Sequence, residues 1–357
     1  MLTRLLSNLF KSRPAQHPQQ AVFEKAEALL NANLAQQAYD TLHPGLDRLN
    51  DHAEAQFVHG TALLEMSRAS DALPSLNRAV AINPREPRFL YNLAMAHWYL
   101  GDTTRTIELC KQAVAIADFR PAHVLLVNIH LNGDHYFTVL GRLHDHLKPA
   151  TYIEVGVFRG ESLKVVQPAT LTLGVDPAPR LDAPPGPNQR IFAETSDDFF
   201  ANHDVMAELG GRPVEMAFID GMHHFEFALR DFINIERLAT PGTVVLVHDC
   251  YPLDEATATR ERNTTFWSGD VWRLMLALKK YRPDLLVNTI ATPPTGLGMV
   301  LNLDPQSRVL SDNLDAITAE FMTTEFSVLE DRKPEVLNLI ANDWAVIQQL
   351  LESRKRH

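Results

Sequence analysis

Residues 214–226 read Val-Glu-Met-Ala-Phe-Ile-Asp-Gly-Met-His-His-Phe-Glu, a short apolar run followed at once by a polar turn. The run has the length and composition of a buried β-strand, and residues 225–238 have the apolar spacing of a helix. Similar strand-like runs lie at 152–155, 171–175, 190–192 and 244–247. Strands that alternate with helices indicate a parallel sheet with helices on both faces, so we predict an α/β domain over residues 151–305.

The alternation of strands and helices ends toward the carboxyl end of the chain. Two apolar runs, 285–290 and 299–303, flank a turn that contains proline and glycine. This arrangement predicts an antiparallel hairpin appended to the sheet. Helical patterns at 311–322 and 334–352 predict that residues 306–357 form C-terminal helices.

The turn after the first strand-like run carries a glycine-containing sequence, Glu154-Val-Gly-Val-Phe-Arg-Gly160. Gly156 allows the backbone to approach a ligand closely, and a helix that starts near Gly160 would present free N–H groups to an anionic group. A dinucleotide-binding turn needs another glycine where this chain has Phe158. The difference counts against a nicotinamide-dependent oxidoreductase, and the carboxylate of an amino acid fits the turn better than a pyrophosphate does.

Polar side chains also follow the next two strand-like runs. Asp176 lies about twenty residues after Gly156, the spacing at which a carboxylate accepts both ribose hydroxyls of a nucleoside. Ser196 and Asp197 follow the run at 190–192 and could reach an adenine edge. Asp and Ser also occur as helix caps or turn residues, so that alternative stays open for all three positions.

The string Ile219-Asp-Gly-Met-His-His-Phe-Glu226 resembles the I-D-G-x-H-x-(Tyr/Phe)-E motif of a branch of class I S-adenosylmethionine-dependent methyltransferases. That branch is related to the sugar and macrolide O-methyltransferases, and residues 241–249, Pro-Gly-Thr-Val-Val-Leu-Val-His-Asp, resemble its fifth strand. The resemblance implies a Rossmann-like domain with a seven-stranded mixed sheet. It also implies a set of residues that hold S-adenosylmethionine: Glu154, Gly156, Gly160 and Asp220 around the methionine part, Asp176 at the ribose, and Ser196 with Asp197 near the adenine.

Methyl transfer requires the protein to align the acceptor, exclude water and remove a proton. His223 is our first candidate for the base and His248 the second, because imidazole titrates near neutral pH. Each could equally be a histidine bonded into its own turn. Some relatives bind a divalent cation through the residues that match Asp220 and Asp249, and such carboxylates would suit Mg²⁺. Cys250 stands where those relatives tend to have another aspartate, which disfavours a metal and leaves Asp220 to contact the donor's amino group.

A long connection, residues 251–272, follows the fifth strand-like run, and long loops at this edge of a sheet often recognise substrate. Arg260 and Arg262 could bind a carboxylate or phosphate, and Trp267 could stack on a sugar. An ordinary surface loop with salt bridges is the alternative. We expect a small-molecule or glycan acceptor.

Residues 19–120 are helical, rich in Ala and Leu, and repetitive. Residues 53–86 align with 87–120, and small residues recur at matching positions. The spacing of Gly60, Ala72, Ala79 and Pro84 resembles the tetratricopeptide repeat, which has a period of about 34 residues. A generic helical bundle is the alternative. The resemblance implies an all-α repeat domain that binds a protein partner or forms a homo-oligomer, joined to the α/β domain by connecting helices over 121–150.

The composition limits the class of protein. The net charge of −11 disfavours nucleic-acid binding, and the two cysteines, Cys110 and Cys250, indicate a reducing, cytoplasmic setting. The N-terminal segment, 1–18, has an amphipathic face that could contact a membrane surface weakly or pack on the first repeat. A non-catalytic scaffold with a degenerate methyltransferase domain is the competing hypothesis, against which the intact Glu154, Gly156 and Asp176 argue.

Overall fold

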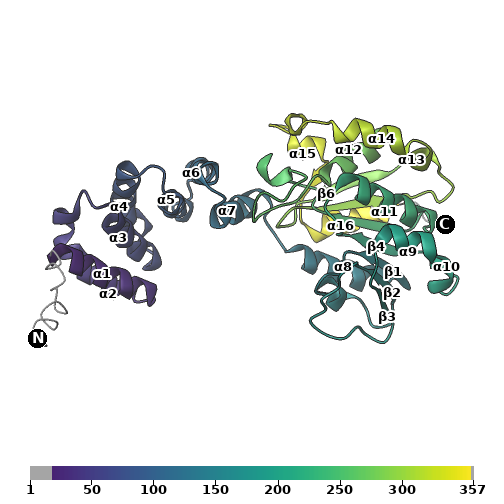
Figure 1. Ribbon diagram of the computed structural model, residues 1–357, viewed down its shortest axis with the longest axis horizontal. Helices are drawn as coiled ribbons and strands as arrows, with labels where there is room; N and C mark the ends of the chain where they lie inside the picture. Colours follow the sequence, from purple (N-terminus) through teal and green to yellow (C-terminus); the bar gives the residue numbers. More distant parts are fainter. Residues whose placement is uncertain (1–17, 355–357) are drawn as a thin grey trace, which may run out of the picture. The chain divides into compact units, whose positions relative to one another are not determined.

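The computed structural model describes residues 18–354 of the 357-residue chain. Contacts within this part divide it into two compact units, with the boundary between Leu126 and Val127. The first unit is helical and the second is built around a sheet (Figure 1). Apart from Pro18, the predicted N-terminal segment lies outside the described residues, so its amphipathic face and its membrane contact stay predictions.

The first unit consists of consecutive helices joined by short turns: α1 (Pro18–Asn31), α2 (Ala35–Leu42), η1 (His43–Leu49), α3 (Ala53–Glu65), α4 (Ala69–Ile82), α5 (Pro87–Tyr99) and α6 (Thr103–Ile116). Gly60 lies where α3 packs on α4, and a Cβ atom added there would stand 2.6 Å from Leu76 Cγ. Ala72 and Ala79 on α4 are fully buried. The small residues of the repeat pattern therefore allow neighbouring helices to pack closely, as the resemblance implied.

Two helices precede the sheet in the chain, α7 (Arg120–His130) and α8 (Tyr136–Leu147). These are the helices predicted over residues 121–150. Helix α8 belongs to the core of the second unit, because Val139 and Leu143 share a buried cluster with Tyr152 of the first strand. It begins with His135, whose side chain accepts a hydrogen bond from Phe137 N.

The second unit contains one eight-stranded sheet with the order β3-β2-β1-β4-β5-β7-β6-β8. Its strands are β1 (Thr151–Val155), β2 (Leu171–Val175), β3 (Gln189–Phe192), β4 (Met216–Ile219), β5 (Val244–His248), β6 (Leu286–Ile290), β7 (Leu297–Leu301) and β8 (Leu339–Ile340). Strands β1 to β5 pair in parallel, and β7 pairs antiparallel with both β5 and β6. The predicted parallel sheet and hairpin are thus confirmed.

Alternate residues of each central strand enter two different buried clusters, as the two-residue period of a β-strand requires. Ala217 and Ile219 of β4 point into one cluster, whereas Met216 and Phe218 point into the other. The first cluster contains residues from α9 (Ser196–Asn202), α10 (Val205–Glu208), α11 (Phe225–Arg237), α12 (Trp272–Tyr281), α13 (Val309–Asp312) and α14 (Leu314–Met322). The second contains residues from α8 and α16 (Trp344–Glu352), so the unit has three layers (Figure 1).

Three local predictions differ from the structure. The segment after Gly160 forms a single 3₁₀ turn, η2 (Ser162–Val165), and not a helix. The predicted helix over 334–352 is divided into α15 (Lys333–Val336), β8 and α16. Strand β8 pairs with β6 and raises the strand number from seven to eight. Apolar periodicity did not reveal these breaks, because tertiary pairing at the sheet edge overrides local helical preference.

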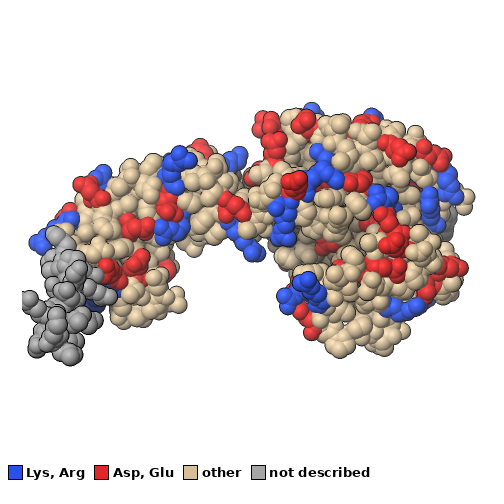
Figure 2. Space-filling view, in the orientation of Figure 1, with Lys and Arg blue, Asp and Glu red and all other residues tan. Residues whose placement is uncertain are grey.

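Positive and negative side chains are interspersed on the face drawn in Figure 2, with no continuous basic stripe among its coloured residues. Among the described residues no helix combines the length and the apolar character needed to cross a membrane.

Candidate active site

A cavity of about 800 Å³ opens at the carboxyl ends of the parallel strands. The sheet order reverses between β1 and β4, because the chain runs from β1 outward to β3 and then returns to β4 on the other side. Open α/β sheets bind ligands at such a switch point. Seven of the residues predicted to hold the donor or catalyse transfer line the cavity: Gly156, Asp176, Ser196, Asp197, Asp220, His223 and His248. Arg262 and Trp267, two of the predicted acceptor contacts, line it too.

Gly156 joins the ends of three strands at the floor of the cavity. Its φ is +90°, and a Cβ atom at this position would lie 2.0 Å from Asp220 O. Its amide donates to Val175 O at 2.8 Å, while Asp220 N donates to Val155 O at 2.8 Å. Only glycine satisfies both the backbone angle and the close approach, so the turn brings the β1 end against the β4 end.

Glu154 and Gly160 do not line the cavity. Glu154 is fully buried, and its carboxyl accepts hydrogen bonds from Tyr152 Oη at 2.8 Å and from the Ser162 hydroxyl. Burial raises its pKa to about 7. Gly160 has a φ of +74°, and a Cβ there would meet Leu181 Cδ2 at 2.9 Å. Both residues therefore lie behind the turn around Gly156 and not on the cavity wall.

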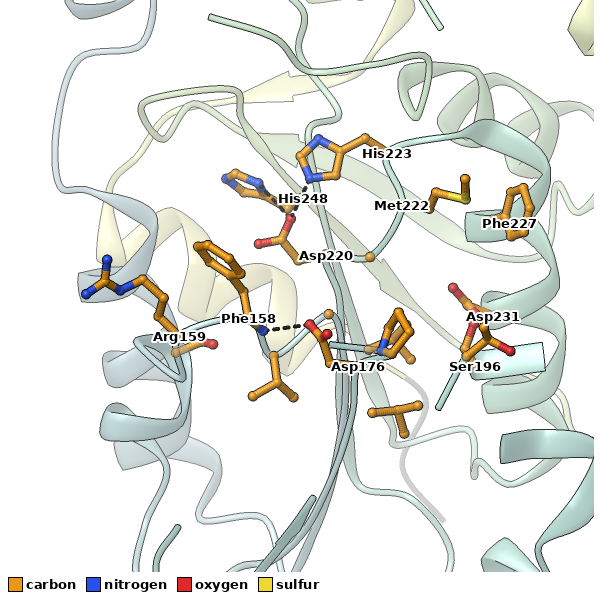
Figure 3. A pocket seen from close by; sticks show the side chains of 18 of the residues that line it. Phe158, Arg159, Asp176, Ser196, Asp220, Met222, His223, Phe227, Asp231 and His248 are labelled. Carbon is orange, nitrogen blue, oxygen red and sulfur yellow. Dashed lines mark hydrogen bonds and ion pairs between the residues drawn. The ribbon is translucent and has the colours of Figure 1, made fainter. Parts of the chain in front are cut away.

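Asp176, at the end of β2, lines the cavity and also holds the turn after β1. One carboxylate oxygen accepts from Phe158 N at 2.7 Å and the other from Ala178 N at 2.8 Å. Figure 3 shows the first of these bonds as a dashed line. Each carboxylate oxygen has more than one lone pair, so both can still accept from a ligand hydroxyl. The cap and ribose interpretations of Asp176 are thus compatible.

Ser196 and Asp197 form the first turn of α9, which Thr195 caps through a hydrogen bond from Asp198 N. The carboxylate of Asp197 accepts two hydrogen bonds from Arg230, at 2.8 and 2.6 Å. A paired carboxylate of this kind has less capacity to accept from a ligand than a free one. Of the two predicted adenine contacts, Ser196 is thus the more available.

Two histidines and two aspartates meet at the ends of β4 and β5. Figure 3 shows His223, His248 and Asp220 of this cluster. His223 Nδ1 lies 2.9 Å from Asp249 Oδ2, and His223 Nε2 lies 3.6 Å from Asp220 Oδ1. His248 Nδ1 is 3.2 Å from each of the same two carboxylates. His223 and Asp249 have φ values of +59° and +60°, so strained turns hold both side chains in place.

Burial disfavours the charged forms of the two histidines in this cluster, but their ion pairs with the aspartates favour those forms more strongly. Burial lowers the pKa of His223, yet Asp249 and then Asp220 raise it above its ordinary value overall. The pKa of His248 is raised well above the ordinary value in the same way, with Asp220 as the strongest favourable neighbour. The pKa of Asp249 is lowered, because His223 and His248 overcome the effect of burial. The two carboxylates therefore favour the protonated form of each imidazole.

The long connection after β5 contributes one face of the cavity. Trp267 stacks in parallel on His223, with ring centroids 5.1 Å apart and an interplanar angle of 2°. Its indole N–H donates to Thr259 O at 2.6 Å, which fixes the ring. The Arg262 guanidinium lies 5.9 Å from the Trp267 centroid. These residues form a flat aromatic surface beside the candidate base.

Arg260 does not line the cavity. Its guanidinium donates to both oxygens of Glu226, at 2.7 and 2.9 Å, and to Asp270 at 2.8 Å. Asp270 is fully buried and also accepts from Phe225 N. Arg260 thus anchors the loop to α11, and the predicted substrate contact is left to Arg262 and Trp267.

Sequence reasoning assigned no role to several lining residues. Tyr136 on α8 packs against His248 with ring centroids 4.2 Å apart, and nothing in its local sequence indicated this contact. Asp231 is buried and lines the cavity. Its place among Ala228, Leu229 and Phe232 on the apolar face of α11 was a usable signal, because an acidic group in a buried stripe is unusual.

Comparison with known proteins agrees with this geometry. Residues 153–250 match the family model described as a methyltransferase domain. The chain carries a methyltransferase domain. Residues 57–121 match the model of the tetratricopeptide repeat, so the methyltransferase domain follows a repeat domain in the chain. The matched span of the methyltransferase domain runs from within β1 to just beyond β5 and includes every strand end described above.

Similar solved structures exist for each part of the chain. The O-methyltransferase TomG from Streptomyces achromogenes, solved with SAM, is 17% identical over 51% of this chain and 89% of its own, with a TM-score of 0.37. Cofactor-bound Rv0187 from MTB is 14% identical over 56% of this chain and 97% of its own, with a TM-score of 0.38. MamA from Desulfovibrio magneticus RS-1 is 25% identical over 31% of this chain and 64% of its own, with a TM-score of 0.30. No curated protein matches the chain.

Proposed function

We propose that this protein transfers a methyl group from S-adenosylmethionine to an oxygen atom of a small molecule or glycan. The observation that carries the proposal is the convergence of Gly156, Asp176, Ser196 and Asp220 on one cavity beside His223. The four come from the ends of β1, β2, β3 and β4, the edge at which this class of sheet binds nucleosides.

In this proposal each part of the donor meets a different strand end. The Gly156 turn and Asp220, whose backbones approach each other closely, would hold the methionine part. The ribose hydroxyls donate to Asp176, which retains free lone pairs. When bound, the donor supplies a methyl group on a sulfonium, which becomes a neutral thioether once the methyl group has left.

The residues around the cavity mouth have the remaining tasks. In its neutral form, His223 accepts the proton of the acceptor hydroxyl as the new carbon–oxygen bond forms. Asp249 orients the imidazole and stabilises the imidazolium that results, at a distance of 2.9 Å. Trp267 covers the other side of His223 and provides a flat surface for the acceptor, and Arg262 supplies a positive charge next to it.

A divalent cation fits this cluster only in part. Asp220, His223 and Asp249 each offer one ligand atom, and these atoms lie within 4.8 Å of one another. The two carboxylates would suit Mg²⁺, but both already pair with histidines, and the void beside all three ligand residues is only about 10 Å³. We therefore derive no step through a metal.

We assign the repeat domain to recognition of a protein partner or to self-association, as stacked helical repeats present extended surfaces. Light scattering of the full chain over a range of concentrations tests self-association. A constant monomeric mass would leave only the partner role.

Calorimetric titration of S-adenosylhomocysteine into the full-length protein tests the proposed function. We expect saturable binding with a stoichiometry of one, and a gain in thermal stability. Transfer of isotope-labelled methyl groups from S-adenosylmethionine to a panel of hydroxylated small molecules and sugars then identifies the acceptor. Absence of both heat and thermal shift would overturn the enzyme assignment and favour the scaffold hypothesis.

A further inference from the structure

Phe158 is a strained and exposed aromatic residue that lines the cavity. Its φ is +42°, and its side chain is 58% exposed, more than any other large apolar side chain within residues 127–354. Phe158 N donates to Asp176 Oδ2 at 2.7 Å, and Phe158 O accepts from Arg180 N at 2.8 Å, so hydrogen bonds hold the backbone on both sides. A left-handed backbone and an exposed ring are each unfavourable for phenylalanine, which indicates that this side chain is placed to contact a ligand.

The Phe158 ring points toward the end of the cavity that contains the candidate base. In Figure 3 it extends from the turn after β1 toward Asp220 and His248, whereas Ser196 and Asp231 lie at the opposite end. This direction places the ring on the acceptor side of the cavity in the proposed function.

The walls of the cavity around the candidate base are flat and aromatic. Trp267 stacks on His223 with ring centroids 5.1 Å apart. Tyr136 packs against His248 and against Phe137, with ring centroids 4.2 Å apart in both pairs. All five residues line the cavity. Aromatic rings attract one another in offset-stacked and edge-to-face arrangements, so these walls favour an acceptor that is itself a flat ring.

The charged side chains near the candidate base are largely committed to one another. Asp220 pairs with both histidines, and Arg159 pairs with Asp182. Arg262 and Glu161 line the cavity without an ion pair within residues 18–354. A sugar carries hydroxyl groups around its whole ring and needs several hydrogen-bond partners, whereas an aromatic ring needs few. The polar groups at this end therefore suit an aromatic acceptor better than a sugar.

We infer that the acceptor is a hydroxylated aromatic compound, and that the ring of Phe158 contacts the acceptor ring and thereby selects it over a sugar. This inference rests on the proposed function, since it concerns the acceptor of the same reaction. The new bond joins the methyl carbon to the phenolic oxygen as the carbon–sulfur bond of the sulfonium breaks. The phenolic proton passes to neutral His223.

Calorimetric titration of matched compounds into the protein saturated with S-adenosylhomocysteine tests the inference, because binding does not depend on how reactive each hydroxyl group is. The aromatic probes are para-hydroxybenzoate and para-cresol. Each is compared with its saturated cyclohexane counterpart, and D-glucuronate and D-glucose are the sugar probes. We expect the aromatic probes to bind about tenfold more tightly than their saturated counterparts and than the sugars.

Phe158→Asn removes the ring, and asparagine tolerates the left-handed backbone, so the turn keeps its hydrogen bonds. The aromatic preference should fall to within about threefold, while the affinity for S-adenosylhomocysteine changes by less than about twofold. Phe158→Tyr retains a ring and should retain the preference. Val328→Ser is the matched control, since Val328 is an exposed apolar residue that does not line the cavity.

The outcomes separate this inference from the proposed function. If the wild-type protein binds no S-adenosylhomocysteine, both fail. If it binds S-adenosylhomocysteine but no aromatic probe, or binds the saturated compounds or sugars as tightly, the inference is overturned while the function stands. Full preference in Phe158→Asn overturns the assignment to Phe158. Should Phe158→Asn lose S-adenosylhomocysteine binding, Phe158→Gly repeats the test, because glycine adopts this backbone angle without strain. The same loss in Phe158→Gly would place the ring in donor binding and overturn the inference.

Discussion

Gly156 and Asp220 approach each other so closely that a Cβ atom on Gly156 would lie 2.0 Å from the Asp220 carbonyl oxygen. The two residues are at the ends of adjacent strands, β1 and β4, on either side of the point where the sheet order reverses. This contact sets the floor of the cavity and aims the Asp220 side chain toward His223 and His248.

Gly156→Ala should abolish donor binding. The φ of +90° costs an L-residue roughly 1–2 kcal/mol, and the collision with Asp220 O forces the strand ends apart. Gly210→Ala is the control, because Gly210 has a φ of +66° but no atom within 4 Å of the added Cβ. Titration with S-adenosylhomocysteine should separate the two variants, and equal binding by both would show that the close approach is unimportant.

His223→Gln should lower kcat by roughly 10²–10⁴-fold, because the acceptor hydroxyl loses its base. Donor affinity should change less than about threefold, since the imidazole is not assigned to donor binding. The control is His224→Gln. His224 is the next residue in the chain, but its Nε2 contacts Arg260 O and it does not line the cavity. Similar kcat losses in both variants would argue against a base at position 223.

Arg260→Met and Arg262→Met should have different effects, although the two arginines are only two positions apart in the sequence. Arg260→Met leaves buried Asp270 with one fewer partner and should lower the free energy of unfolding by roughly 2–4 kcal/mol. Arg262→Met should change stability by less than roughly 0.5 kcal/mol but raise KM for an anionic acceptor. Urea unfolding combined with steady-state kinetics checks both effects. A stable, high-KM Arg260→Met variant would instead place Arg260 in acceptor binding.

His144 should make the protein labile to acid. It is fully buried, neither ring nitrogen has a hydrogen-bond partner within residues 18–354, and burial lowers its pKa from 6.5 to about 4. The unfolded chain therefore takes up a proton at higher pH than the folded protein does. The stabilising effect is complete above pH 6.5 and is lost as the pH falls through about 4, a loss of roughly 3 kcal/mol from this residue.

Denaturant unfolding at pH 7.5 and 4.5 measures this effect. His144→Leu should reduce the difference between the two pH values by roughly 2 kcal/mol relative to the wild type. His146→Gln, an exposed change on the same helix, should leave it unaltered. An unchanged pH dependence in His144→Leu would show that other groups account for the acid sensitivity.

Chelation tests whether methyl transfer requires a divalent cation at the ends of β4 and β5. Because His223 and His248 already neutralise Asp220 and Asp249, methyl transfer should continue at full rate in excess EDTA. Added Mg²⁺ should change the rate by less than about twofold. A rate that falls to background with EDTA and returns with Mg²⁺ would show that a cation takes the place of the histidine pairs.

The fold and the set of candidate residues could be predicted from the sequence. Apolar runs of strand length, such as the one that ends at Asp220, are local signals, and so is the recurrence of small residues at Gly60 and Ala72. Parallel strands place their carboxyl ends on one edge of the sheet. The sequence alone therefore predicts that Asp176, Ser196 and Asp220 belong to one site.

Only the tertiary structure decided what each of these groups is free to do. Arg230 donates hydrogen bonds to the carboxylate of Asp197. The Arg260 guanidinium donates to Glu226 and Asp270, and these bonds join distant parts of the chain. The burial of Asp231 likewise depends on how α11 packs against α9. Hydrophobic patterning is local and therefore readable along the sequence, whereas the pairing of polar side chains depends on three-dimensional neighbours, and only the folded chain determines them.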